Sequence, residues 1–122
     1  MTKARQNFGK FGEELACTEL VQRGYSILER GYRTANGELD IVAKDGDYLV
    51  FVEVKARQDD SFGEPEASVT VRKQQKLVWM ATDYLTRHGL GDVPCRFDVV
   101  GINTQQNPPS IVVIPDAFRP GW

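Results

Sequence analysis

The 122-residue chain predicts an α/β fold in which helices flank a central mixed β-sheet, in the order helix, three strands, helix, two strands. Two long segments repeat their apolar residues at helical spacing, while shorter segments between and after them alternate or are rich in β-branched residues. With 41% hydrophobic residues, the chain is long enough for one core and too short for two. We therefore expect a single domain over residues 1–122, with a core at about residues 8–115 and a tail at residues 116–122.

The first helix is predicted over residues 8–23, and Gly24 follows as a stop signal. Apolar residues recur in it at roughly helical spacing. They are Phe8, Phe11, Leu15 and Leu20. We expect a first strand at residues 25–29, and then a polar loop at residues 31–36.

A β-hairpin follows, with strands at residues 38–43 and 49–55 on either side of an Asp-Gly pair, which is among the strongest hairpin signals. Successive side chains of a strand point to opposite faces. One face of the hairpin therefore carries Glu38, Asp40, Val42, Leu49, Phe51, Glu53 and Lys55, and the other carries Leu39, Ile41, Ala43, Val50, Val52 and Val54. Both faces are largely apolar, so an unpaired buried carboxylate here would cost several kcal/mol.

The position of the turn decides which residues face each other. With Asp45 and Gly46 at its centre, Asp40 faces Phe51. Asp40 and Glu53 then lie on the same face as diagonal neighbours, with α-carbons roughly 7–8 Å apart. We therefore expect two carboxylates to meet at the edge of an apolar strand pair.

These residues predict a site for a hard cation. Two carboxylates about 4 Å apart in a partly shielded site would repel by roughly 4 kcal/mol at an effective dielectric near 20. A divalent ion reverses that penalty, and oxygen ligands without His or thiolate favour Mg²⁺ or Mn²⁺ over zinc. Such an ion polarises a phosphoryl oxygen and acidifies a water, while Lys55 faces the developing negative charge. The pattern thus predicts a metal-dependent nuclease, with a Glu53–Lys55 ion pair that reaches solvent as the alternative.

The second helix is predicted over residues 70–88, with Thr70 as N-cap and Gly89 as C-terminal stop. Its expected buried stripe is Leu77, Ala81, Tyr84 and Leu85. Cations in the first turns of a helix oppose its dipole, and a phosphate partner would offset that cost. The candidate nucleic-acid contacts are therefore Arg72, Lys73 and Lys76, unless they simply form a solvated face.

The remaining segments complete the sheet and its connections. Residues 95–102 and 110–114 are strand-like. The loop at residues 58–66 follows the proposed site directly and is placed to act as a flap or a dimer contact, or as an ordinary solvated connection. The tail at residues 116–122 contains Phe118 and Trp122, which would pack as a flap or against another subunit.

Several motifs follow one another along the chain. They are Gly12-Glu13-Glu14, Arg33, Gly37-Glu38-Leu39-Asp40, Val52-Glu53-Val54-Lys55, Phe62-Gly63, Lys73, Ala81 and Tyr84-Leu85. In this order they resemble the bacterial YraN-type proteins, which are grouped with the PD-(D/E)XK nuclease superfamily and likened to archaeal Holliday junction resolvases. The resemblance covers about residues 8–100 and implies a restriction-endonuclease-like core with the order αβββαββ.

The resemblance also implies roles for particular residues. Asp40 and Glu53 would be metal ligands together with the main-chain carbonyl of Val54. Lys55 would be the catalytic lysine. Glu14, which precedes an apolar residue on the first helix, would be an accessory carboxylate that reaches the strand ends, whereas the neighbouring Glu13 is expected to be solvated.

A further implication is an endonuclease that cuts structured or branched DNA, with a two-fold dimer for paired cuts. Gly31 departs from the family pattern, which more often has Asn there. Arg33, two residues later, is a candidate nucleic-acid contact in the loop at residues 31–36.

Charge and composition limit these interpretations. The net charge of −2 counts against a nucleic-acid partner, although residues 1–37 carry six basic side chains and four acidic ones. His88 is the single histidine, so histidine acid–base catalysis is not expected. No apolar run reaches membrane-spanning length and the first residues lack the apolar core of a secretory signal, so we expect a cytoplasmic protein. A non-catalytic nucleic-acid or protein-binding module and an RNA-directed nuclease remain as alternatives.

Overall fold

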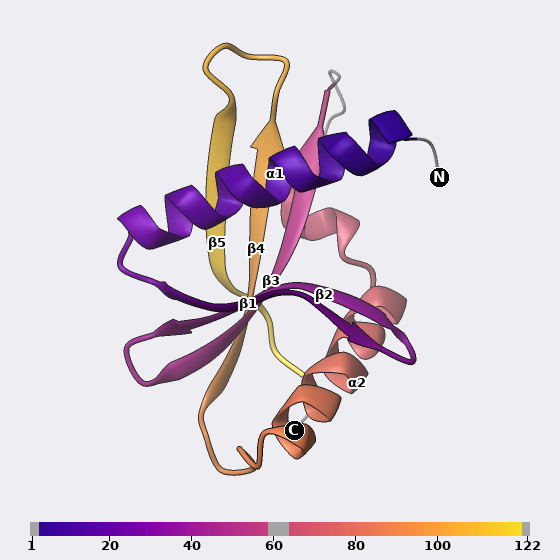
Figure 1. Ribbon diagram of the computed structural model, residues 1–122, viewed down its shortest axis with the longest axis vertical. Coiled ribbons are helices and arrows are strands. Elements are labelled where there is room, and N and C mark those ends of the chain that lie inside the picture. The colour runs from indigo at the N-terminus through magenta and orange to yellow at the C-terminus, as the bar shows by residue number, and fades with distance from the viewer. Residues whose placement is uncertain (1–2, 59–63, 121–122) are drawn as a thin grey trace.

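A five-stranded mixed sheet forms the centre of the described part of the protein, which is residues 3–58 and 64–120 of a computed structural model (Figure 1). The elements are α1 (Lys3–Gln22), β1 (Ser26–Thr34), β2 (Gly37–Asp45), β3 (Tyr48–Arg57), the 3₁₀ turn η1 (Pro65–Ser68), α2 (Val71–Arg87), β4 (Cys95–Asn103) and β5 (Ser110–Phe118). The strands lie side by side in chain order; β3 and β4 are parallel, and the other neighbours are antiparallel. This architecture confirms the predicted α/β fold and its order of elements.

The two faces of the sheet are covered by different helices. Between α2 and the sheet, the buried residues include Val42, Leu49 and Phe51 from the strands, and Leu77 and Tyr84 from the helix. The other helix, α1, crosses β3 to β5 in Figure 1. Between α1 and the sheet, the buried residues include Ala16 and Leu20 from the helix, and Ile41, Val50 and Val52 from the strands. Fully burying a large apolar side chain contributes about 1.5–3 kcal/mol, so these two clusters hold the helices on the sheet. The alternation predicted for the hairpin strands is confirmed at residues 41–43 and 49–52.

The predicted register of the β2–β3 hairpin was wrong. Asp45 pairs with Tyr48, so the turn is centred on Gly46 and Asp47 rather than on the Asp-Gly pair. Gly46 has a φ of 59°, a conformation that glycine adopts without steric cost. The error is two positions, which equals the period of side-chain alternation, so residues 41–43 and 49–52 stay on their predicted faces. Leu39, predicted on the face of Ile41, packs instead in the cluster between α2 and the sheet.

Two strands are longer than expected. β1 continues to Thr34, so most of the predicted loop at residues 31–36 belongs to the sheet. The reason is Tyr32, which is buried under α2 and donates a hydrogen bond to Asp83 Oδ2 at 2.8 Å. β5 continues through Pro115 to Phe118, which an edge strand permits. The predicted tail therefore begins inside β5, while Trp122 lies outside the described residues.

The two helices agree with their predictions to different degrees. α1 begins at Lys3, five residues before the expected start at Phe8. α2 matches its prediction, because the Thr70 hydroxyl accepts a hydrogen bond from the Lys73 N–H at 3.2 Å. Of the predicted loop at residues 58–66, residues 59–63 lie outside the described part, so its action as a flap stays a prediction. No helix in the described ranges is long and apolar enough to cross a membrane.

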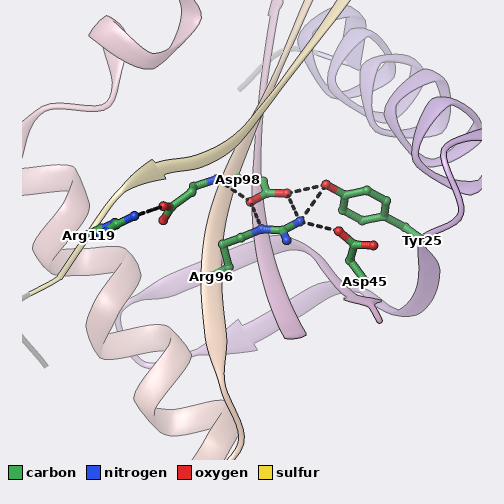
Figure 2. A network of polar contacts seen from close by, with 6 residues as sticks. Tyr25, Asp45, Arg96, Asp98 and Arg119 are labelled. Carbon is green, nitrogen blue, oxygen red and sulfur yellow. Dashed lines mark hydrogen bonds and ion pairs between the residues drawn. The ribbon is translucent and has the colours of Figure 1, made fainter. Parts of the chain in front are cut away.

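A buried network of hydrogen bonds and ion pairs connects strands on the face of the sheet that α1 covers (Figure 2). Asp98, only 1% exposed, accepts hydrogen bonds from the Tyr25 hydroxyl at 2.7 Å and from two nitrogens of Arg96 at 2.9 Å. It also accepts one from the Asp116 N–H at 3.0 Å, and Arg96 reaches Asp45 at 2.9 Å. Burial and the bond to Asp98 raise the pKa of Tyr25. The network therefore links the ends of β2, β4 and β5 with the segment before β1.

Candidate active site

β2 and β3 separate at the end of the hairpin opposite its turn. The last pair of their ladder is Ile41 with Val52, although both strands continue beyond it. From there β2 pairs with β1 and β3 with β4, and Figure 1 shows the two strands diverging. Asp40 and Glu53 are the next residues on the two strands. They therefore lie at a fork in the sheet, one position beyond the last pair, where the observed register would make them opposite rather than diagonal neighbours.

Asp40 takes the place of a backbone partner at this fork. Its Oδ2 accepts a hydrogen bond from the Val54 N–H at 2.8 Å, which β2 no longer satisfies through its main chain. Burial, the charge of Glu53 and a hydrogen bond between the two carboxyl groups raise the pKa of Asp40 to about 8. The predicted pair of acids is thus brought together, in a position where one of them favours its protonated form.

Two lysines complete the cluster. The Nζ atom of Lys73, on the first turn of α2, lies 3.4 Å from Glu53 Oε1. Burial and the neighbouring Lys73 lower the pKa of Lys55. Burial opposes the charge on Lys73 as well, but the hydrogen bond with Lys55 and the charge of Glu53 together raise its pKa. The site therefore holds two carboxylates and two amines from three elements.

Lys73 was predicted as a contact for the DNA backbone, and its place beside Glu53 was not foreseen. A signal for it exists in the sequence. Lys73 stands four residues before Leu77 and eleven before Tyr84, both buried on α2, so helical spacing puts it on the sheet-facing side.

On α1, a charge that acts on the cluster comes from Glu13, whereas Glu14 is the predicted accessory carboxylate. Glu13 is partly buried, and its charge contributes to the raised pKa of Asp40. Burial and the charge of Glu38 in turn raise the pKa of Glu13 itself. Glu14 is exposed. Helical spacing could have shown this, because Glu13 is three residues before the buried Ala16.

A close approach of α1 to β3 holds Glu13 in position. A Cβ atom on Gly12 would lie 3.0 Å from the Cβ of Ala56, so the helix meets the strand at its glycine. A larger side chain there would push the first half of α1 away from the fork.

The other predicted nucleic-acid contacts surround the cluster. Arg33, with a side chain that is 89% exposed, lies 3.6 Å from Glu38. Arg72 and Lys76 are exposed on α2. Lys76 also lines a hollow of about 150 Å³ that is bordered by Glu38 and Glu53. Lys76 therefore borders the fork, while Arg33 pairs with Glu38 on β2 and Arg72 lines a second hollow together with Lys73.

The donor set fits a small hard cation. Asp40 and Glu53 present carboxylate oxygens, and their mutual repulsion would be relieved by a divalent ion as well as by a proton. In the described ranges, no three His, Cys, Asp or Glu side chains gather closely enough to hold a metal by themselves. An ion here would therefore need a further oxygen, which the main-chain carbonyl of Val54 or water would supply.

The mixed sheet, its two covering helices and the acid pair at the fork are consistent with a restriction-endonuclease-like core. Residues 12–102 match the profile of the uncharacterised protein family UPF0102, and the chain belongs to this family. This confirms the resemblance to the YraN-type proteins.

Relatives match over nearly their whole length. A UPF0102 protein of Thermodesulfovibrio yellowstonii is 48% identical over 103 residues, which cover 84% of this chain and 91% of the relative. One of Dehalococcoides mccartyi is 41% identical over 118 residues, 97% of this chain and 98% of the relative. One of Moorella thermoacetica is 43% identical over 120 residues, 97% of this chain and all of the relative. The names of these relatives state no activity.

Proposed function

We propose that this protein is a Mg²⁺- or Mn²⁺-dependent nuclease that hydrolyses phosphodiester bonds in structured or branched DNA. One observation carries the proposal: Asp40 and Glu53 meet at the fork of the sheet with the amines of Lys55 and Lys73 beside them. Acids that hold a cation, next to amines that stabilise negative charge, are the groups that phosphodiester hydrolysis requires.

Each group has a distinct task in this proposal. Asp40 and Glu53 would hold the cation, with the carbonyl of Val54 as a third ligand. When bound, the ion would polarise the phosphoryl group and lower the pKa of a coordinated water. Lys55 would stabilise the negative charge that develops on the phosphate. Lys73, already within 3.4 Å of Glu53, would orient that carboxylate and attract the phosphate.

A cleavage panel tests the proposal. Linear, flapped and four-way DNA would be incubated with Mg²⁺ or Mn²⁺ and the wild type, Asp40→Ala or Asp47→Ala. We expect metal-dependent cleavage that Asp40→Ala abolishes, while Asp47→Ala, which removes an exposed carboxylate in the hairpin turn, keeps it. Cleavage that persists in folded Asp40→Ala protein would refute the assignment. The same substrates made of RNA identify the nucleic acid that is cut.

A non-catalytic nucleic-acid-binding module is the second candidate, because Lys73 already pairs with Glu53 and no third acidic side chain joins the pair in the described residues. Isothermal titration with Mg²⁺ separates the two. The nuclease predicts metal binding that depends on Asp40, whereas the module predicts DNA binding without it.

A further inference from the structure

The outer face of α2 exposes a tryptophan. Trp79 is 63% exposed, and Val71, two turns earlier, is 69% exposed. Both point away from the apolar cluster that α2 buries against the sheet. An indole ring in water leaves a large apolar surface uncovered, so this ring is available to a partner.

Between the start of α2 and Trp79, the charged side chains of the helix are all positive. Arg72, Lys76 and Trp79 stand at positions i, i+4 and i+7, so they share one side of α2. The only acid of α2 is Asp83, which accepts a hydrogen bond from Tyr32 and pairs with Arg87 at 3.2 Å. The positive end of the helix dipole lies at the same end. The surface therefore favours an anionic partner with a flat apolar group.

This surface is continuous with the candidate active site. A hollow of about 590 Å³ on it is lined, among the described residues, by Thr70, Arg72, Lys73, Gln75, Lys76 and Trp79. Lys73 and Lys76 also line the smaller hollow that reaches Glu53. Six residues separate Lys73 from Trp79, which is about 9 Å along the helix axis. A nucleic-acid strand whose phosphate lies at the fork would therefore bring its neighbouring nucleotides to Trp79.

We propose that Trp79 stacks on an unpaired base of the DNA substrate, and that Arg72 and Lys76 bind the phosphates next to it. Bases within a duplex already stack on each other, so a free base face is offered by flaps, forks and gaps. A protein partner would have to supply acidic side chains opposite Arg72 and Lys76 as well as an apolar group that covers the indole, whereas a nucleotide carries its phosphate and its flat base together. This inference rests on the proposed function, because it assigns the substrate as DNA with an unpaired nucleotide close to the scissile bond.

DNA binding measured without divalent ions tests the proposed stacking on Trp79 independently of cleavage. Fluorescence anisotropy in EDTA would give the affinity for flapped DNA and for a blunt duplex of equal charge. We expect Trp79→Ala to lower the preference for the flap by about 5- to 150-fold, and Trp79→Phe to keep most of it. Leu28→Ala is the matched control, since it truncates an apolar side chain that is 49% exposed on β1.

A second measurement follows the ring itself. Trp122→Phe leaves Trp79 as the single tryptophan of the chain, and we expect flapped DNA to quench the fluorescence of Trp79 more than the blunt duplex does.

The Asp40→Asn variant should keep the preference for flapped DNA even though it is expected to lose cleavage, so a failed nuclease assay leaves this inference standing. An unchanged preference in Trp79→Ala would overturn it. So would a preference seen only with an RNA flap, or loss of self-association in Trp79→Ala without an effect on DNA.

Discussion

Asp40 experiences two opposing influences at the fork. The N–H of Val54 donates to its carboxylate and favours the charged form, while burial and Glu53 favour the neutral form. The second influence is stronger, which is why the pKa is raised. A carboxyl group in this situation is stabilised either by a proton or by a cation, and the two should compete for it.

The stability of the protein should therefore depend on pH through Asp40. An aspartate has a pKa of about 3.9 when unfolded, whereas that of Asp40 in the fold is about 8. The stabilisation from its proton is fully present below about pH 4 and is lost as pH rises through about 8. In metal-free buffer, we expect the free energy of unfolding of the wild type, relative to Asp40→Asn, to fall by at most about 1.4 kcal/mol per pH unit across this window.

Urea unfolding of both proteins at about pH 5, 7 and 9 measures this difference. Asparagine keeps an acceptor for the Val54 N–H, so the comparison isolates the charge. A stability difference that does not change with pH would contradict the raised pKa.

At the level of elements, the sequence predicted faces better than it predicted registers. Alternation put Asp40 and Glu53 on one face, and that survived an error of two positions because the side-chain period is also two. The register was not accessible, because Asp45, Gly46 and Asp47 offer two adjacent turn pairs and the pairing across the sheet decides between them. Likewise, helical spacing indicates the sheet-facing side for Lys73, but its pairing with Glu53 depends on how α2 packs against β3, which no local pattern contains.

The Asp98 network shows how separate elements depend on one buried charge. Asp98→Ala removes one of the two acidic partners of Arg96, whose side chain is only 15% exposed, and the acceptor of the Tyr25 hydroxyl. Removing one member of a buried ion pair typically costs about 3–5 kcal/mol. We expect a loss of that size in the free energy of unfolding.

Denaturant unfolding of Asp98→Ala beside Glu19→Ala checks this expectation. Glu19 forms a surface ion pair with Arg23 at 2.9 Å, so its loss should cost at most about 1 kcal/mol. Equal effects of the two substitutions would show that the network does not fasten the sheet.

For the whole molecule, the arrangement of charges matters more than the net charge of −2. The acids near the fork are Glu13, Glu38, Asp40 and Glu53, and the cations are Arg33, Lys55, Lys73 and Lys76. This region is thus near balance, and one divalent ion would make it positive. The acidic chain should therefore still attract phosphate at this place.

The salt dependence of DNA binding tests that arrangement. Arg33, Arg72 and Lys76 are exposed around the fork and on α2, so we expect about three phosphate contacts with duplex DNA. Three contacts predict a slope of about −2.7 for log K against log salt, which is roughly a 40-fold loss of affinity between about 50 and 200 mM.

The double variant Arg72→Ala with Lys76→Ala should reduce the magnitude of this slope by about 1.8, as measured by fluorescence anisotropy in EDTA. Arg23→Ala, which changes a residue just after the C-terminal end of α1, should leave the slope unchanged. Equal slopes in all three proteins would mean that α2 does not bind the DNA backbone.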